Sequence, residues 1–216
     1  GNNDYAYDGN GNLISDANKG ISIEYNHLNL PMKVDAGGGK VIHWLYTAGG
    51  AKLKKVVQQP GQNDVVRDYL GAFIYQDGQL EFFAAAGGRV VSDPSGGQEF
   101  RYEHYYVDHL GNTRLGYSDL DWDGVIDAGT EIIQEEHYYP FGMSFSGIAG
   151  PQIGAEHRFK FNGKEVQEEF GIGLQDFGAR MYDRQLGRWN GIDPLAEKFA
   201  SLSPMVFAFN NPVMFF

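Results

Sequence analysis

The sequence predicts an all-β protein, a meander of short antiparallel strands joined by tight turns. Glycine makes up 30 of the 216 residues, against an average near ~7%. Aromatic residues (15 Phe, 13 Tyr and 3 Trp) outnumber the 17 Lys and Arg. Ile21, Ile23 and Tyr25 alternate with polar residues, as in a strand with one buried face. At most one or two short helices are expected, near the C-terminus.

The N-terminal half favours one hairpin after another. YDGNGNL at residues 7–13 and YNHLNL at 25–30 form a degenerate repeat in which Asp, Asn and Gly supply the turn between apolar strand residues. Segments 40–47 and 51–58 flank a turn at Ala48–Gly50, and segments 64–75 and 79–86 flank Asp77–Gly78. Asp-Gly is typical of two-residue hairpin turns. We therefore expect a single strand over each flanking segment.

The C-terminal half continues the pattern with interruptions. Residues 92–97 form a surface loop, residues 99–118 give two strands around Leu110–Thr113, and an acidic loop over 119–131 precedes a further strand at 131–141. After a flexible segment at 147–154, residues 157–165 predict a strand that enters an Asn162–Gly163 turn. Pro194–Ala200 is the best helix candidate, capped by Asp193. We divide the chain into a sheet region, 1–150, and a final segment, 151–216, within one continuous unit.

Composition excludes several classes of function. The formal net charge of −11 argues against nucleic-acid binding, which requires cations for the phosphates. The absence of Cys excludes disulfides, thiol catalysis and Cys-based zinc sites. No apolar run reaches the length of a membrane helix, so no transmembrane segment is expected. Gly1–Asn2 is typical of an engineered start and NNPVMFF of a cut end, so we expect the natural protein to continue.

The acidic loop contains a partial calcium-binding pattern. Asp119, Asp121 and Asp123 occupy alternate positions, Gly124 the sharp turn, and Asp127 a later ligand position. The position of the bidentate Glu is taken by Thr130, and Glu131 lies one residue too late. Weak calcium binding is therefore one interpretation, and a solvated acidic hairpin tip is the other.

Arg180 and Asp193 are the candidate catalytic residues, since a guanidinium keeps a neighbouring carboxylate ionised and able to act as a base. A structural ion pair is the alternative that the residues alone favour. His104 and His109 are expected on opposite faces of one strand, which argues against a histidine metal site. We interpret an apparent glycosidase carboxylate pair among Glu135, Glu136, Glu165, Glu168 and Glu169 as chance, and strand aromatics as core residues rather than a sugar-stacking platform.

The C-terminal segment matches a known pattern at many points: Gly173–Leu174, Phe177, Ala179–Arg180, Tyr182–Asp183, Gly187–Arg188, Trp189 and Asp193–Pro194. It resembles the RHS repeat-associated core of RHS/YD-repeat proteins, and the segments DYLGAFIYQDGQLEFF, YYVDHLGNTR and FKFNGKE follow in the family's order. Phe177, Arg184 and Gly191 depart from the family's Tyr, Pro and Ser. The second Asp-Pro of the family would begin just after the printed sequence.

The resemblance implies a YD-repeat sheet that spirals into a hollow shell, whose core domain plugs it and cuts off a variable, often toxic C-terminal region. Arg180 and Asp193 would supply the Arg and the first of two Asp residues for that cut. The first hypothesis is thus a non-catalytic shell fragment around a toxin cargo, and the second an autoprotease core. A weaker third is an extracellular carbohydrate- or surface-binding module. We expect a secreted or envelope location, with partners in the toxin region, the rest of the shell, or a second copy bound through strand edges.

Overall fold

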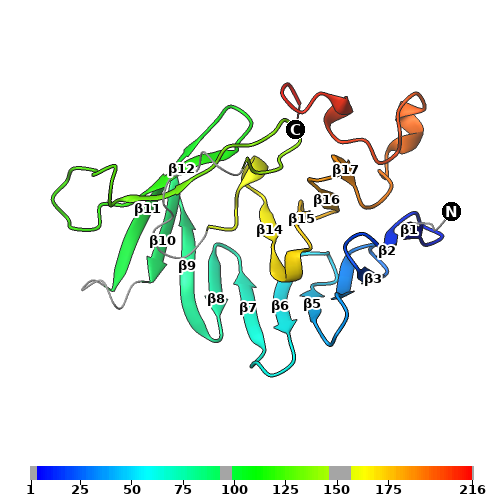
Figure 1. Ribbon diagram of the computed structural model, residues 1–216, viewed down its shortest axis with the longest axis horizontal. Helices are drawn as coiled ribbons and strands as arrows, with labels where there is room; N and C mark the ends of the chain where they lie inside the picture. The colour runs from blue at the N-terminus through cyan, green and yellow to red at the C-terminus, as the bar shows by residue number, and fades with distance from the viewer. Residues whose placement is uncertain (1–3, 93–98, 146–156, 216) are drawn as a thin grey trace.

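The computed structural model describes residues 4–92, 99–145 and 157–215, and its described part is all-β, as predicted. Thirteen antiparallel strands, each hydrogen-bonded to its neighbours in sequence, form one sheet (Figure 1). Its strands are β1 Tyr5–Tyr7, β2 Leu13–Asp16, β3 Ile21–Tyr25, β4 Pro31–Asp35, β5 Val41–Tyr46, β6 Lys52–Gln58, β7 Val65–Leu70, β8 Phe73–Gln76, β9 Gln79–Ala85, β10 Gly88–Ser92, β11 Phe100–Val107, β12 Thr113–Tyr117 and β13 Ile132–Glu135.

A second, four-stranded antiparallel sheet follows, with strands β14 Glu165–Gln167, β15 Leu174–Asp176, β16 Met181–Asp183 and β17 Arg188–Trp189. Four 3₁₀ segments complete the described elements: η1 Phe161–Gly163, η2 Glu169–Gly171, η3 Ala196–Phe199 and η4 Ala208–Asn210. Within the described ranges, no helix has the length and hydrophobicity needed to cross a membrane.

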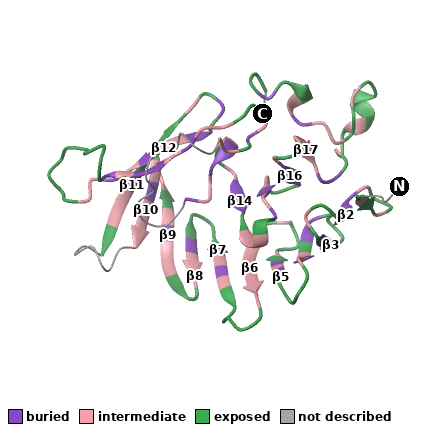
Figure 2. Ribbon diagram, in the orientation of Figure 1, coloured by how far each residue is buried: buried purple, intermediate pink, exposed green. Residues whose placement is uncertain are grey.

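The large sheet curves around the small one (Figure 1). The buried face of β2 to β5 contributes Leu13, Ile21, Ile23, Val34, Ile42 and Trp44. These residues pack against Leu174 and Met181 of the second sheet and against Ile172, which directly follows η2. In Figure 2 buried residues occur on strands of both sheets. The apolar side chains of alternating strand positions thus hold the two layers together.

A second core is aromatic and belongs to the C-terminal part. Phe161, Tyr182 and Phe207 are almost fully buried, with Tyr138, Phe141, Phe177 and Trp189 packed around them. The ring centroids of Tyr182 and Phe207 are 4.3 Å apart. Aromatic pairs in such close contact add stabilisation beyond that from their buried area. This cluster fixes β16, β17 and the segment that follows them.

The structure corrects several local expectations. Residues 64–75 are not one strand: Gly71, at φ +67°, turns the chain between β7 and β8. An additional strand, β10, which was not expected from the sequence, follows β9. Residues 157–165 are not a strand either, because a tight loop closed by the Lys160 N–H and the Lys164 carbonyl, 3.1 Å apart, contains the 3₁₀ turn η1.

Two further corrections concern the candidate helix and the histidines. Only Ala196–Phe199 of Pro194–Ala200 is helical, as a 3₁₀ turn. His104 lies in β11 but His109 lies in the turn beyond it, so they do not share a strand. The expected flexible segment at 147–154, the boundary between 150 and 151, the chain ends at Gly1–Asn2 and Phe216, and most of the expected loop at 92–97 lie outside the described residues.

Candidate functional site

The structure places Arg180 and Asp193 in contact beside the hairpin of β16 and β17. Arg180 directly precedes β16, and Asp193 follows β17, so the hairpin of these two strands brings them together. The Arg180 Nη2 atom donates to Asp193 Oδ2 at 2.9 Å. The guanidinium also lies over the Trp189 ring, 4.2 Å from its centroid, which is a favourable cation–π geometry. The Arg180 guanidinium is therefore held by both the Asp193 carboxylate and the Trp189 ring.

The Asp193 backbone and carboxylate have further partners. Oδ1 accepts a hydrogen bond from the Leu195 N–H at 2.8 Å, and the Asp193 N–H donates to the Pro204 carbonyl at 2.8 Å. These bonds tie Asp193 both to the turn that follows it and to the segment that runs back along β17. The two side chains remain 20% and 35% exposed, so solvent reaches them.

A cavity of about 370 Å³ opens beside this pair. Arg180, Asp193 and Ser203 supply its polar part, and the rest of the lining is mainly apolar: Trp189, Ala196, Phe199, Leu202, Pro204, Val206, Phe207, Ala208, Phe209, Met214 and Phe215. The Arg180 Nη1 atom is buried and has no hydrogen-bond partner among the described residues. Buried donors are normally paired, so this guanidinium nitrogen is an exception within a residue that also binds Asp193.

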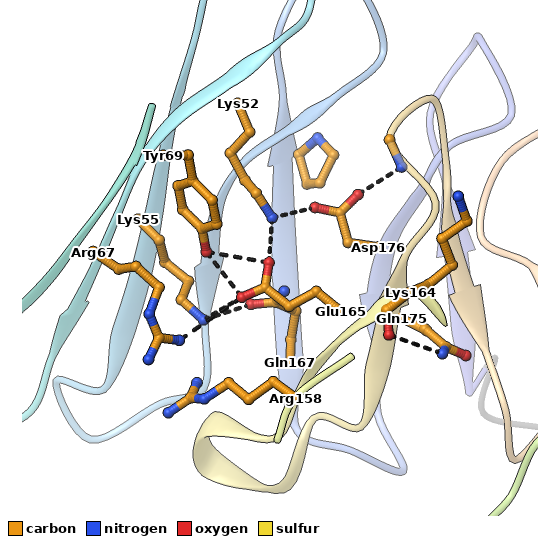
Figure 3. Close-up of polar contacts among 12 residues, drawn as sticks. Lys52, Lys55, Arg67, Tyr69, Arg158, Lys164, Glu165, Gln167, Gln175 and Asp176 are labelled. Carbon is orange, nitrogen blue, oxygen red and sulfur yellow. Dashed lines mark hydrogen bonds and ion pairs between the residues drawn. The ribbon is translucent and has the colours of Figure 1, made fainter. Parts of the chain in front are cut away.

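A buried ionic cluster between the two sheets escaped the sequence analysis (Figure 3). The Lys52 Nζ atom lies 2.5 Å from Glu165 Oε2 and 2.7 Å from Asp176 Oδ2. Lys55 Nζ lies 2.7 Å from Glu169 Oε1. The Tyr69 hydroxyl donates to Glu165 at 2.9 Å. The lysines and Tyr69 come from the large sheet, Glu165 and Asp176 come from the second sheet, and Glu169 comes from η2, which follows β14. These contacts therefore join the layers.

The electrostatics of the cluster follow from burial and pairing. Burial alone would raise the pKa of Glu165, but Lys52, Lys55 and the Tyr69 hydroxyl together lower it to about 2. Burial also opposes the charge of Lys52, yet Glu165 and Asp176 raise the Lys52 pKa above its ordinary value. Lys55 has its pKa lowered, because burial outweighs its acidic partners. Glu165 is therefore the centre of the ionic contact between the two sheets.

The acidic loop brings three of its four candidate ligands together. One oxygen each from Asp119, Asp121 and Asp123 lie within 4.8 Å of one another, and Asp127 is not part of this group. Asp119 Oδ2 accepts from the Gly124 N–H at 2.9 Å, and Asp123 Oδ1 from the Val125 N–H at 2.7 Å. The loop thus uses carboxylate oxygens to order its own backbone.

Glu131 has the same role and is not available as a bidentate ligand. Its Oε1 accepts from the Leu120 N–H at 2.5 Å and its Oε2 from the Asp127 N–H at 2.8 Å. The hydrogen bonds from the Asp127 and Leu120 N–H groups are the main cause of a lowered pKa for Glu131. A calcium ion in this loop would therefore depend on the three aspartates and on water.

No protein-family model matches the chain. Salivary gland surface protein 1 of Aedes aegypti is 35% identical over 117 residues, which cover 53% of this chain and 3% of that protein. Toxin subunit YenC1 of Yersinia entomophaga is 32% identical over 117 residues, or 54% of this chain and 10% of that subunit.

Solved structures give the wider match. The TcdB2-TccC3 crystal structure has a TM-score of 0.73 at 20% identity, covering 96% of this chain and 11% of that one. The chain has the fold of a segment of a Tc toxin. The structure of the Photorhabdus luminescens Tc holotoxin pore also has a TM-score of 0.73, at 19% identity, and the match covers 97% of this chain and 10% of that one. The chain therefore spans about a tenth of these Tc toxin structures, and the likeness shows the fold.

Proposed function

We propose that the chain is part of the wall and inner core of an RHS-type shell that encloses a C-terminal toxin cargo. The observation that supports this proposal most is the architecture: a continuous meander of 13 strands curved around a second sheet, in the fold of a Tc toxin segment. The 32% identity to a toxin subunit over about half of the chain supports the same class.

The edges of the large sheet fit this role. Among the described residues, β1 pairs only with β2 and β13 only with β12, so both outer strands offer unpaired backbone groups. Exposed edges of this kind pair with further strands. In a shell, the neighbouring parts of the same polypeptide would fill them, and in the isolated chain a second copy would. An extracellular location follows from the proposal, because the toxin class acts outside the producing cell.

Protease protection tests the shell. The chain is expressed in its full reading frame, and limited proteolysis is followed by mass spectrometry before and after mild denaturation. A shell leaves the C-terminal region intact in the native protein and degraded after unfolding. Cleavage of that region at the same rate in both states would contradict the proposal.

The Arg180–Asp193 pair favours a second role, self-cleavage that releases the C-terminal region. Aspartate-dependent peptide hydrolysis uses two carboxylates that share a proton. Asp193 would be one, oriented by Arg180 at 2.9 Å, and the second would come from residues after Phe216. The cavity beside the pair gives a peptide segment room to approach Asp193.

Extension of the native reading frame by roughly 20 residues, about 70 Å of extended chain, provides the test. We expect a shortened product on a denaturing gel, and none from Asp193→Asn. Asp119→Asn, in the distant acidic loop, is the matched control and should be processed normally. A folded, extended chain that stays full length would refute self-cleavage but would leave the shell proposal standing.

A further inference from the structure

The segment after the buried Phe207 adopts a backbone that L-residues avoid. Ala208, Phe209 and Asn210 have φ values of +47°, +51° and +62°. They form a single left-handed turn, closed by the Asn210 N–H to the Phe207 carbonyl at 2.9 Å and the Asn211 N–H to the Ala208 carbonyl at 2.8 Å. The left-handed region brings Cβ close to the following carbonyl oxygen. Asn tolerates it, but Ala and Phe do so rarely.

This turn is anchored on one side and directs the chain on the other. Before it, the Trp189 N–H donates to the Met205 carbonyl at 3.0 Å, and Phe207 is packed against Tyr182 and Trp189. After it, the Met214 and Phe215 N–H groups both donate to the Asn211 carbonyl at 3.1 Å. Met214 and Phe215 thereby return to line the cavity that holds Arg180 and Asp193.

Phe209 occupies the centre of this arrangement. Its ring lies 5.4 Å from the Phe199 ring and 5.8 Å from the Phe215 ring, and all three line the cavity. Phe209 is 52% exposed, so burial of its own side chain contributes little to holding the strained backbone. Strain that the surrounding structure maintains is found mainly at functional sites.

We propose that the left-handed turn Ala208–Asn210 is a positioning element for self-cleavage. It fixes Phe209 so that the chain beyond Asn211 runs back across the cavity toward Asp193. The proposal rests on the self-cleavage role described above and adds to it the element that sets where the cleaved segment lies.

The substitution Ala208→Gly distinguishes a positioning role of the turn from a purely structural role. Glycine adopts positive φ without steric cost, so Ala208→Gly relieves the strain and Tm should rise by about 2 °C. The same change leaves the turn free to adopt other conformations, and a misplacement of about 1 Å costs up to roughly 100-fold in rate. In the extended chain we therefore expect self-cleavage to slow by about tenfold or more while stability increases. A turn with only a structural role would show the stability gain and an unchanged cleavage rate.

Ala200→Gly is the matched control, because Ala200 is exposed and has a φ of −57°. It should lower Tm slightly and leave cleavage unchanged. Asn210→Gly, at the other end of the turn, should reproduce the slower cleavage. Ala208→Gly that cleaves at the parental rate, or that lowers Tm as Ala200→Gly does, would overturn the positioning proposal while leaving self-cleavage intact. An unsubstituted chain that never cleaves would overturn both.

Discussion

Lys52→Met removes the cation that lies between two buried carboxylates. Glu165 and Asp176 are directly opposite on neighbouring strands, and Lys52 contacts both, at 2.5 Å and 2.7 Å. Breaking a buried ion pair from one side costs about 3–5 kcal/mol, because the remaining charge is left without compensation. For a chain of this size, that loss corresponds to a fall in Tm of roughly 6–20 °C.

The pKa of Glu165 determines how the stability of the chain changes with pH. In the unsubstituted chain the folded pKa of Glu165 is about 2, against an ordinary value of 4.5. Its stabilisation is therefore complete above about pH 4.5 and is lost as pH falls toward 2, an effect of about 3 kcal/mol. Without Lys52, burial has a larger share and raises the Glu165 pKa. Lys55 and the Tyr69 hydroxyl still lower that pKa, so Lys52→Met should lose less stability than the parent when pH is lowered from about 4.5 to about 3.

Urea denaturation at pH 7, about pH 4.5 and about pH 3 measures both effects. Lys54→Met is the control, since Lys54 is on the same strand, 41% exposed, and paired with Asp68 at 3.0 Å. Exposed pairs of this kind contribute less than about 1 kcal/mol. Equal losses for the Lys52 and Lys54 variants would refute the structural role of the cluster, as would a Lys52→Met protein that loses as much stability as the parent between about pH 4.5 and about pH 3.

Two further predictions concern a glycine and the acidic loop. Gly142→Ala should destabilise by about 1–3 kcal/mol more than Gly61→Ala, because both have positive φ but only at Gly142 would a Cβ meet a neighbour, the Phe161 ring at 2.5 Å; equal Tm losses would disprove the clash. In the acidic loop, calorimetry should detect weak calcium binding, with Kd of roughly 10⁻⁴–10⁻³ M, that Asp121→Ala abolishes, and the absence of heat from either protein would exclude the site.

The strand meander could be predicted because its signals are local. Alternation at Ile21, Ile23 and Tyr25 and the turn at Asp77–Gly78 depend on neighbouring residues alone, and both appear in the structure. The turn at Gly71 was missed because strand-forming residues stand on both sides of it, VVRDYL before and AFIY after, so the whole segment is equally consistent with one longer strand. The left-handed turn at Ala208–Asn210 has no glycine, so only tertiary packing reveals it.

The site was predictable only in part. Arg180 and Asp193 stand at the two ends of one hairpin, so a sequence pattern brings them together. Lys52 and Glu165 are 113 residues apart. Strand alternation also misleads here, because a bulge opposite Leu45 and Tyr46 shifts the register of β6 and lets both Lys52 and Lys55 reach the second sheet. Pairing across two sheets leaves no local trace in the sequence.

Single-cysteine labelling tests the shell most directly, since the chain has no native Cys. Leu45→Cys marks the outer face of β5, opposite the buried Trp44, and Met214→Cys marks the cavity side; the native side chains are 56% and 69% exposed. In the full reading frame, a bulky maleimide should label native Leu45→Cys readily and Met214→Cys only after unfolding, whereas in the 216-residue chain both should react. Rapid labelling of Met214→Cys in the native full-length protein would contradict an enclosed core.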